Sequence, residues 1–382
     1  MNKDGNSNLK IAMIGSKGLP ALFGGIERHV EEIGRRLAGR GHEITVFGRK
    51  PFSIDGEHLG MNVRLLPSIP TKNLDAGTHS FIATMKALSG PFDIIHYHGI
   101  GPSLFAGIPV MANKLTVSTV HALDYRQSKW GRVVKYLLRK GEARAVRSAS
   151  ATIAVSKLMA EDLSSRYSSK VVYIPNGATL RESPPLRDLL GLGIESGKFI
   201  LTVGRFIVER GFDTLLEAWS EIDTDMKLVI VGDERFEVEY ARKLHGIADN
   251  RVIFPGYVAG ENLDELYAHC AFYVLPSLVE GLPISLMEAM SFSRPVLISD
   301  IPENLEVAGK VGAIFKRGDK SDLGRGLREM IVLDDSRASW MGSHGRKKIE
   351  EEYNWDSVAE RTERFYLDLI HGAGKQLEDD RM

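Results

Sequence analysis

The sequence predicts an α/β protein with two doubly wound parallel-sheet domains. At 382 residues the chain is longer than one ordinary hydrophobic core accommodates. Short runs rich in Val and Ile alternate with longer helical patterns, which is typical of parallel sheets covered on both faces. A stretch over residues 177–197, rich in proline and glycine, separates two series of such runs and suits an interdomain connection.

The expected strands fall into two series. The first comprises residues 10–15, 43–48, 62–67, 93–99, 115–121, 151–156 and 170–175, and the second comprises residues 198–204, 227–233, 251–256, 271–276, 295–300 and 312–315. We therefore expect an N-terminal domain over residues 1–180 and a C-terminal domain over residues 195–355. A further helix is expected over residues 355–370, and the C-terminal segment 356–382 is expected to cross back to the first domain.

Composition narrows the classes of function. A formal net charge of -1, with both signs spread along the chain, gives no reason to expect nucleic-acid binding. The single cysteine, Cys270, lies in an apolar stretch, and we expect a buried thiol in a reducing compartment. The start of the chain is short and polar, and no apolar run approaches the roughly 20 residues of a membrane span. These features predict a cytoplasmic protein.

A glycine pair follows the first expected strand. Gly24 and Gly25 open a helix whose apolar residues Ile26, Val30 and Ile33 fall on one stripe. Exposed backbone N–H groups at a helix start can bind a phosphate or a sugar hydroxyl, and glycine lets a ligand approach closely. The alternative is a flexible loop, because this is not the G-x-G-x-x-G dinucleotide pattern.

Two arginines follow the first strand of the second series. Arg205 comes in Val-Gly-Arg, and Arg210 comes in Glu-Arg-Gly just before a helix. Guanidinium groups offer several directed donors to a diphosphate and keep their charge at any working pH. Two of them could stabilise a departing nucleoside diphosphate. Solvated or ion-paired surface arginines are the alternative.

The most specific motif lies at residues 275–290. Glu280 sits in the loop after a strand, Pro283 suits a first helical turn, and seven residues separate Glu280 from Glu288. Glu280 could accept from sugar hydroxyls, and Glu288 could hold the vicinal hydroxyls of a ribose. The N–H groups around Gly281, Leu282, Pro283 and Ile284 would face a diphosphate. A charge that only stabilises the helix start remains possible for Glu280.

Three histidines end two strands of the first series: His96, His98 and His121. No acidic or cysteine ligand accompanies them at a recognisable spacing, so we do not expect a zinc site. His121, at the very end of its strand, is the better candidate for a contact with a transferred sugar. Strand alternation leaves open which of His96 and His98 points toward a ligand.

Residues 126–147 form a basic segment that contains Trp130 and Tyr136. A helix of this composition could rest on an anionic membrane, at the inner face of the cell membrane, where a lipid-linked acceptor waits. An ordinary domain helix with a solvated basic face is the alternative.

Taken together, these motifs resemble glycosyltransferase family 4, from about residue 10 to residue 370. The Glu280/Glu288 pair is the most specific element, and Ile174-Pro-Asn-Gly177 and Pro276-Ser277 also match. Arg210 departs from the family, which usually has lysine at this place. The resemblance implies a GT-B fold, with two Rossmann-like domains facing across a cleft, and a retaining, metal-independent hexosyltransferase without a cofactor. The opening glycine-rich segment and Asp300-Ile-Pro-Glu-Asn304 resemble bacterial enzymes of exopolysaccharide, O-antigen or capsule assembly.

The resemblance also implies roles for individual residues. Arg205 and Arg210 would bind the donor diphosphate, Glu288 the ribose, and Glu280 and His121 the sugar. Gly24 and Gly25 would close over the phosphates from the first domain. The nucleobase would be framed by Val231, Gly232, Gly256 and Tyr257. The donor would be a UDP-, GDP- or dTDP-sugar, and the acceptor a saccharide or lipid-linked saccharide.

Other functions remain open on the sequence alone. A dinucleotide-dependent oxidoreductase should show G-x-G-x-x-G after a strand, which neither domain has. A sugar-nucleotide epimerase of the same fold and a non-catalytic nucleotide-sugar-binding protein are the two alternatives to a transferase, because a fold does not fix a function.

Overall fold

The computed structural model describes residues 8–22, 24–71, 74–127, 130–185, 187, 191–232 and 237–379. The chain forms two compact units: unit 1 is Met1–Asn176 with Trp355–Met382, and unit 2 is Gly177–Asn354. Parts of the expected segments lie outside the described residues, namely Phe23 beside the glycine pair, Ser128 and Lys129 in the basic segment, Leu186 and residues 188–190 in the connection, and Asp233 at a strand end.

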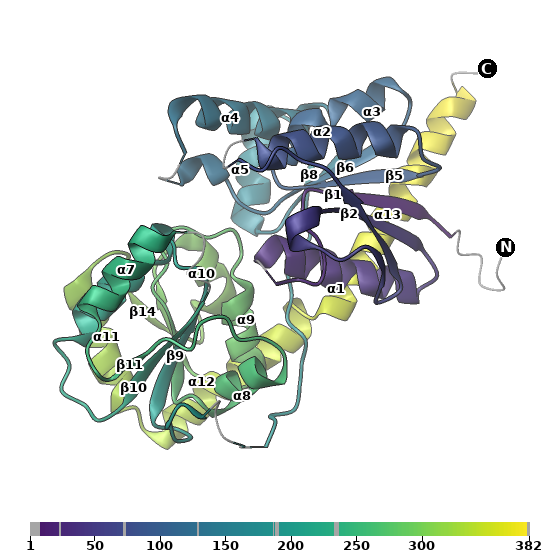
Figure 1. The fold of residues 1–382 in the computed structure, drawn as a ribbon. Helices are drawn as coiled ribbons and strands as arrows, with labels where there is room; N and C mark the ends of the chain where they lie inside the picture. Colours follow the sequence, from purple (N-terminus) through teal and green to yellow (C-terminus); the bar gives the residue numbers. More distant parts are fainter. Residues whose placement is uncertain are drawn as a thin grey trace. The chain divides into compact units, whose positions relative to one another are not determined.

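Unit 1 contains an eight-stranded sheet in the order β3-β4-β2-β1-β5-β6-β7-β8 (Figure 1). The strands are β1 (Lys10–Ile14), β2 (Glu43–Arg49), β3 (Gly56–His58), β4 (Met61–Leu66), β5 (Ile94–His98), β6 (Leu115–Val120), β7 (Ala151–Ala154) and β8 (Val171–Tyr173). All seven expected runs of the first series form parallel strands, as predicted. The sequence did not predict β3, which pairs antiparallel with β4 at the edge of the sheet.

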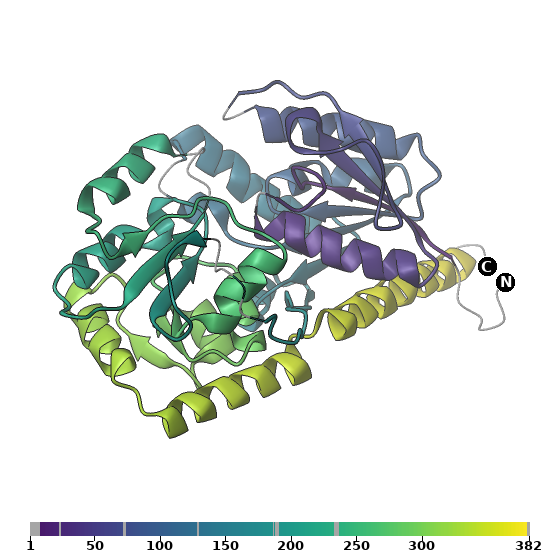
Figure 2. The same cartoon turned by 60° about the horizontal axis from the view of Figure 1, so that its bottom comes forward.

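Helices cover both faces of this sheet (Figures 1 and 2). One face carries α2 (Asp75–Leu88), α3 (Gly107–Met111), α4 (Arg132–Arg147) and α5 (Lys157–Tyr167), and the other carries α1 (Gly25–Gly39) and α13 (Trp355–Asp379). The expected helix over residues 126–147 starts only at Arg132, directly after Gly131, and Arg126 belongs to a 3-10 turn, Asp124–Arg126. No helix in the described part of the chain is both long and apolar enough to cross a membrane.

The last helix, α13, completes unit 1. Trp355, Val358 and Tyr366 are buried. The hydroxyl of Tyr366 forms a hydrogen bond with Nδ1 of His96, on the central strand β5, at 2.6 Å. Glu363 of α13 accepts from Nη1 of Arg40 at 2.6 Å and pairs with Nε2 of His42 at 2.9 Å. The helix extends nine residues beyond the expected end at residue 370.

Unit 2 contains a six-stranded parallel sheet in the order β11-β10-β9-β12-β13-β14. Its strands are β9 (Phe199–Val203), β10 (Lys227–Val231), β11 (Val252–Ile253), β12 (Phe272–Leu275), β13 (Val296–Ser299) and β14 (Ala313–Phe315). Each expected run of the second series contains one of them. Figure 1 shows the helices α7 (Val238–Ile247) and α11 (Lys320–Ile331) on one face, and α8 (Glu261–His269), α9 (Ile284–Ser291) and α12 (Asp335–Glu352) on the other. Helix α6 (Phe212–Trp219) packs against α7 and α11.

The core of unit 2 lies under α6, α7 and α11. Phe212, Leu215 and Trp219 are buried there against strand residues such as Leu228 and Val274. Burial of this apolar surface is the main favourable contribution to folding. Cys270 is a free, fully buried thiol, as predicted, and burial raises its pKa to about 12.

Replacing Glu363 by Gln should destabilise unit 1 by about 1–3 kcal/mol, because buried hydrogen bonds to a charged group are lost. The backbone N–H of Leu9 donates to Nδ1 of His42, so Nε2 carries the proton that reaches Glu363. Burial opposes ionisation of Glu363, but the hydrogen bonds from His42 and Arg40 outweigh it and lower the pKa of this carboxyl. Glu363 is therefore ionised at neutral pH, where urea unfolding should measure the loss of stability.

The same lowered pKa predicts a pH dependence. The ionised carboxylate contributes fully above its ordinary pKa of 4.5, and this contribution disappears as the pH falls through the folded-state value. Glu360→Gln is the matched control, since Glu360 is 56% exposed and pairs with Arg364 on the same helix. It should cost no more than about 0.5 kcal/mol. Equal losses of stability in the two variants would contradict the inference that the hydrogen bonds of Glu363 stabilise the packing of α13 in unit 1.

Candidate active site

In unit 2 the carboxyl ends of three strands are joined by backbone hydrogen bonds. Gly204, after β9, donates to the carbonyl of Val231 at 2.9 Å, and Gly232, after β10, donates to the carbonyl of Gly256 at 3.0 Å. A β-carbon on Gly232 would lie 2.0 Å from the oxygen of Gly204, so this position has to be glycine. Open parallel sheets bind ligands at this edge, where Tyr257 is half exposed.

The loops after β9 and β12 touch through their backbones. The amide of Leu278 donates to the carbonyl of Glu209 at 2.8 Å. Gly211 has a φ of +67°, and a β-carbon there would lie 2.3 Å from the oxygen of Pro276. A left-handed glycine at the start of α6 therefore lets the second loop pack directly on the first.

This contact brings Arg210 and Glu280 together. Nη1 of Arg210 forms an ion pair with Oε1 of Glu280, and the hydroxyl of Ser277 donates to the same oxygen at 2.7 Å. The side chains are 19% and 8% exposed, respectively. A guanidinium carries five N–H donors, so an arginine held by one carboxylate keeps donors for a second anion.

Glu288 is held by a different partner. The hydroxyl of Tyr267, on α8, donates to Oε2 of Glu288 at 3.2 Å. Tyr267 packs against Tyr273 of β12, with ring centroids 5.9 Å apart, and the hydroxyl of Tyr273 bonds Oγ of Ser285 at 2.9 Å. Glu288 is half-buried on α9, and its carboxylate is held by the hydroxyl of Tyr267, which in turn packs on Tyr273.

The remaining expected residues of unit 2 lie on the same two loops. Arg205 is partly exposed, and its side chain forms no hydrogen bond or ion pair with the described residues of unit 2, which omit residues 186, 188–190 and 233–236. Residues Gly281, Leu282, Pro283 and Ile284 are buried. No side chain caps α9, which begins directly after Pro283, so its first N–H groups are suited to an anion.

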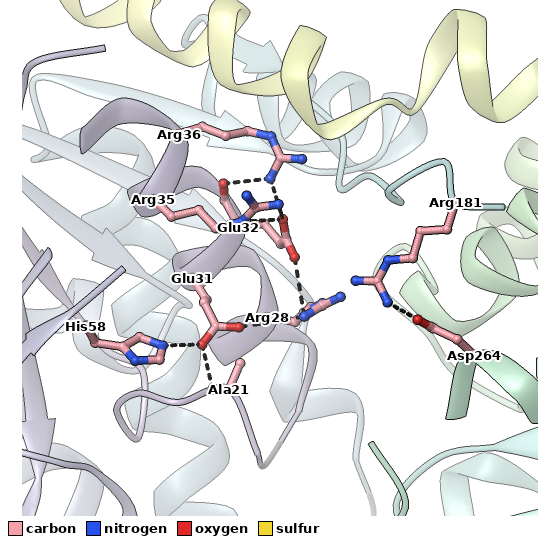
Figure 3. Close-up of polar contacts among 9 residues, drawn as sticks. All are labelled: Ala21, Arg28, Glu31, Glu32, Arg35, Arg36, His58, Arg181 and Asp264. Carbon is pink, nitrogen blue, oxygen red and sulfur yellow. Dashed lines mark hydrogen bonds and ion pairs between the residues drawn. The ribbon is translucent and has the colours of Figure 1, made fainter. Parts of the chain in front are cut away.

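In unit 1, glutamates of α1 bind two backbone amides in the segment that follows β1. Glu27 accepts from the amide of Lys17 at 2.8 Å, and Glu31 accepts from the amide of Ala21 at 3.0 Å (Figure 3). Glu31 also pairs with Nε2 of His58 at 2.8 Å. These two loop amides are therefore engaged by the protein itself.

The next glutamate on α1 anchors three arginines. Glu32 is 3% exposed and contacts Arg28 at 3.3 Å, Arg35 at 2.6 Å and Arg36 (Figure 3). Burial alone would raise the pKa of Glu32, but the three guanidiniums outweigh it and lower this pKa. Figure 3 also draws an ion pair within unit 2, from Arg181 to Asp264.

The histidines of unit 1 are buried at the carboxyl ends of β5 and β6. Nδ1 of His98 lies 3.3 Å from Nε2 of His121, while the ring of His29, on α1, lies 4.6 Å from that of His121. His96 bonds Tyr366 and Thr119 instead. Burial lowers the pKa of His29 to about 4 and the pKa values of His98 and His121 well below 6.5. All three imidazoles are therefore neutral near pH 7.

The structure thus joins Arg210 to Glu280 directly and holds Glu288 through Tyr267. Sequence reasoning missed Ser277, Tyr267 and His29 as neighbours of the expected residues. His29 gave a signal, because it lies three residues after Ile26 and four before Ile33, on the apolar stripe of α1.

Two family models match this chain. The model for glycosyltransferase family 4 covers residues 23–182, and the model for glycosyl transferases group 1 covers residues 197–332. The chain belongs to glycosyltransferase family 4. It is a transferase of the glycosyl-transferring class, and the expected GT-B fold is confirmed.

Relatives support this assignment along nearly the whole length. O-antigen chain mannosyltransferase C of Escherichia coli is 23% identical, over 92% of this chain and 96% of its own. Among solved structures, sucrose-phosphate synthase from Thermosynechococcus elongatus has a TM-score of 0.80 at 22% identity, covering 96% of this chain and all of that one. Anabaena HepE in complex with UDP and glucose has a TM-score of 0.78 at 18% identity, covering 94% and 100%.

Replacing Gly211 by Ala should destabilise unit 2 by about 1–3 kcal/mol, because its φ of +67° and the oxygen of Pro276 both oppose a side chain. Thermal unfolding measures the loss. Gly246→Ala is the control: this glycine lies in α7, and nothing lies within 4 Å of its added β-carbon. Alanine there should be neutral or stabilising, and a similar loss at both positions would refute the backbone argument.

Proposed function

We propose that this glycosyltransferase is a retaining enzyme that moves a sugar from a nucleotide-sugar donor to a saccharide or lipid-linked saccharide. The observation that carries the proposal is the partly buried Arg210–Glu280 ion pair at the strand-end edge of unit 2. A cation for a diphosphate and a carboxylate for sugar hydroxyls stand there side by side, beside the uncapped start of α9. The donor has both chemical groups, joined by the bond that breaks.

The donor's nucleotide part would be held by unit 2. The guanidinium groups of Arg205 and Arg210 would bind the diphosphate, together with N–H groups around Gly281 and Ile284. Glu288 would accept from both ribose hydroxyls, with Tyr267 keeping its carboxylate in place. The strand ends at Val231, Gly232, Gly256 and Tyr257 would frame the nucleobase.

The transferred sugar would be contacted by Glu280 and by His121, and Gly24 and Gly25 would approach the phosphates. We propose front-face substitution, in which the acceptor hydroxyl attacks from the side of the leaving group and passes its proton to the departing phosphate oxygen. Arg205 and Arg210 would stabilise the negative charge that develops there. The step requires no metal ion, since the cations are supplied by side chains.

A role in assembling a cell-surface polysaccharide is supported by the relative named as an O-antigen mannosyltransferase. The acceptor of such a pathway can be lipid-linked, and α4 offers a surface that suits a membrane. Val133, Tyr136 and Leu137 are 73%, 57% and 45% exposed, and Lys140 follows at the same helical spacing. Apolar side chains flanked by cations are typical of interfacial helices.

The donor site is tested by ligand binding to variants of Glu288 and Glu280. Titration with UDP, GDP and dTDP and their sugars should identify the nucleotide, starting from UDP. Glu288→Ala should weaken the nucleoside diphosphate by about tenfold or more, or ~1.4 kcal/mol. Glu280→Gln should leave the nucleoside diphosphate bound but weaken the nucleotide sugar and slow transfer.

The control for both is Glu329→Gln on α11, whose carboxylate is 61% exposed. Unchanged binding of the nucleotide in Glu288→Ala would remove Glu288 from the ribose role. NMR of the product anomer tests retention, and an inverted anomer would refute front-face substitution. An isomerised nucleotide sugar would instead indicate an epimerase, and tight binding without turnover would indicate a non-catalytic binding protein.

Membrane contact through α4 is tested with phosphatidylglycerol vesicles. Lys140→Glu should lower vesicle binding by roughly 30-fold, because each charge near an anionic surface contributes about 1 kcal/mol and the reversal changes the net charge by two. Arg242→Glu, a charge reversal at a 71% exposed position on α7, is the control and should change binding little. If both variants sediment with vesicles like the parent protein, α4 has only a solvated basic face.

A further inference from the structure

Three buried imidazoles meet at the strand-end edge of unit 1. His29 comes from α1, His98 from the end of β5 and His121 from the residue after β6. One ring nitrogen of each lies within 4.8 Å of the others. We call these three residues the histidine trio.

The first member of the trio is already oriented as a metal ligand would be. Nδ1 of His29 lies 3.0 Å from the amide oxygen of Asn176. Because that oxygen only accepts, Nδ1 carries the proton and Nε2 keeps its lone pair. Metal-binding histidines almost always donate their second N–H to such an acceptor.

The other two members face each other. Nδ1 of His98 lies 3.3 Å from Nε2 of His121, and a single proton satisfies that contact. Nε2 of His98 is then left buried without a hydrogen-bond partner among the described residues. An unpartnered buried polar atom is unfavourable and needs an explanation, and a metal ion bound there would supply the missing partner.

The surroundings hold the trio in place. The ring of His96 packs against that of His98 with centroids 4.1 Å apart, and its two nitrogens are engaged by Tyr366 and Thr119. Trp355 packs edge-on against His29 at 5.7 Å. His96 therefore restricts the trio without belonging to it.

We propose that the histidine trio binds a divalent transition-metal ion of the zinc type. A tetrahedral ion with Zn–N bonds of about 2.0–2.1 Å separates its nitrogen ligands by roughly 3.3 Å, and one nitrogen of each ring of the trio already lies within 4.8 Å of the others. Neutral imidazoles suit zinc, cobalt, nickel and copper, whereas magnesium and calcium prefer oxygen ligands. Three protein ligands leave a fourth position open.

Metal binding would have a consequence for catalysis, which rests on the function proposed above. His121 would be engaged by the ion and withdrawn from the sugar, so zinc would inhibit transfer. The site itself does not depend on that function, because binding can be measured without donor or acceptor.

The experiment is a titration of the purified full-length protein with Co²⁺, followed by visible absorption. We expect ligand-field bands that saturate at one ion per chain, are displaced by Zn²⁺ and persist in excess Mg²⁺. His29→Gln and His121→Gln should each weaken binding by about tenfold or more. Asn176→Ala should weaken it by about 10–100-fold, through the lost orientation of His29.

The control is His344→Gln, an exposed histidine of unit 2 that stacks on Trp340; it should bind Co²⁺ like the parent. Circular dichroism verifies that each variant is folded. Absence of ligand-field bands in the parent protein would overturn the proposal, as would unchanged binding in folded His29→Gln and His121→Gln. If Co²⁺ binds but Zn²⁺ does not affect transfer, the metal site stands and the role of His121 in sugar binding fails.

Discussion

In both units, a backbone carbonyl oxygen lies so close to a glycine that a β-carbon could not be added to that glycine. The oxygen of His98 lies 2.4 Å from the position of such a β-carbon at Gly15, and the oxygen of Pro276 lies 2.3 Å from it at Gly211. Only glycine permits such approach. The contact at Gly211 brings Arg210 to Glu280, and the contact at Gly15 packs the first loop of unit 1 onto the strand that carries the histidines. The chemistry of each unit therefore depends on close backbone packing at a glycine that contributes no side chain to the site.

Much of the architecture could be predicted from the sequence, because buried parallel strands are apolar throughout and contrast with the helices around them. The exceptions have physical reasons. The edge strand β3, Gly56–His58, is short and mostly exposed, so it has no hydrophobic pattern to detect. Helix α4 starts at Arg132 rather than at residue 126, since a basic segment with scattered apolar residues does not mark a helix start.

The candidate site could be predicted as a set of residues but not as a set of contacts. Arginines and glutamates just after strands were evident, because the edge where strands end is where open sheets bind ligands. Their partners come from other elements. Tyr267, which donates a hydrogen bond to Glu288, lies on α8, the helix before strand β12, whereas Glu288 lies on α9, the helix after that strand. His29, the member of the histidine trio that sequence reasoning missed, lies on a helix whose stripe indicated burial, and only the fold shows that it meets the ends of two strands.

The placement of α13 affects how the chain is made. Unit 1 takes its last helix from the end of the sequence, after all of unit 2. During synthesis, residues 1–176 emerge from the ribosome without Tyr366 to cover His96 and without Glu363 to pair with His42. Unit 2 is contiguous and has its whole sheet available earlier. The second unit to be translated is therefore the first that can finish folding, while the first waits with an uncovered surface, open to chaperones.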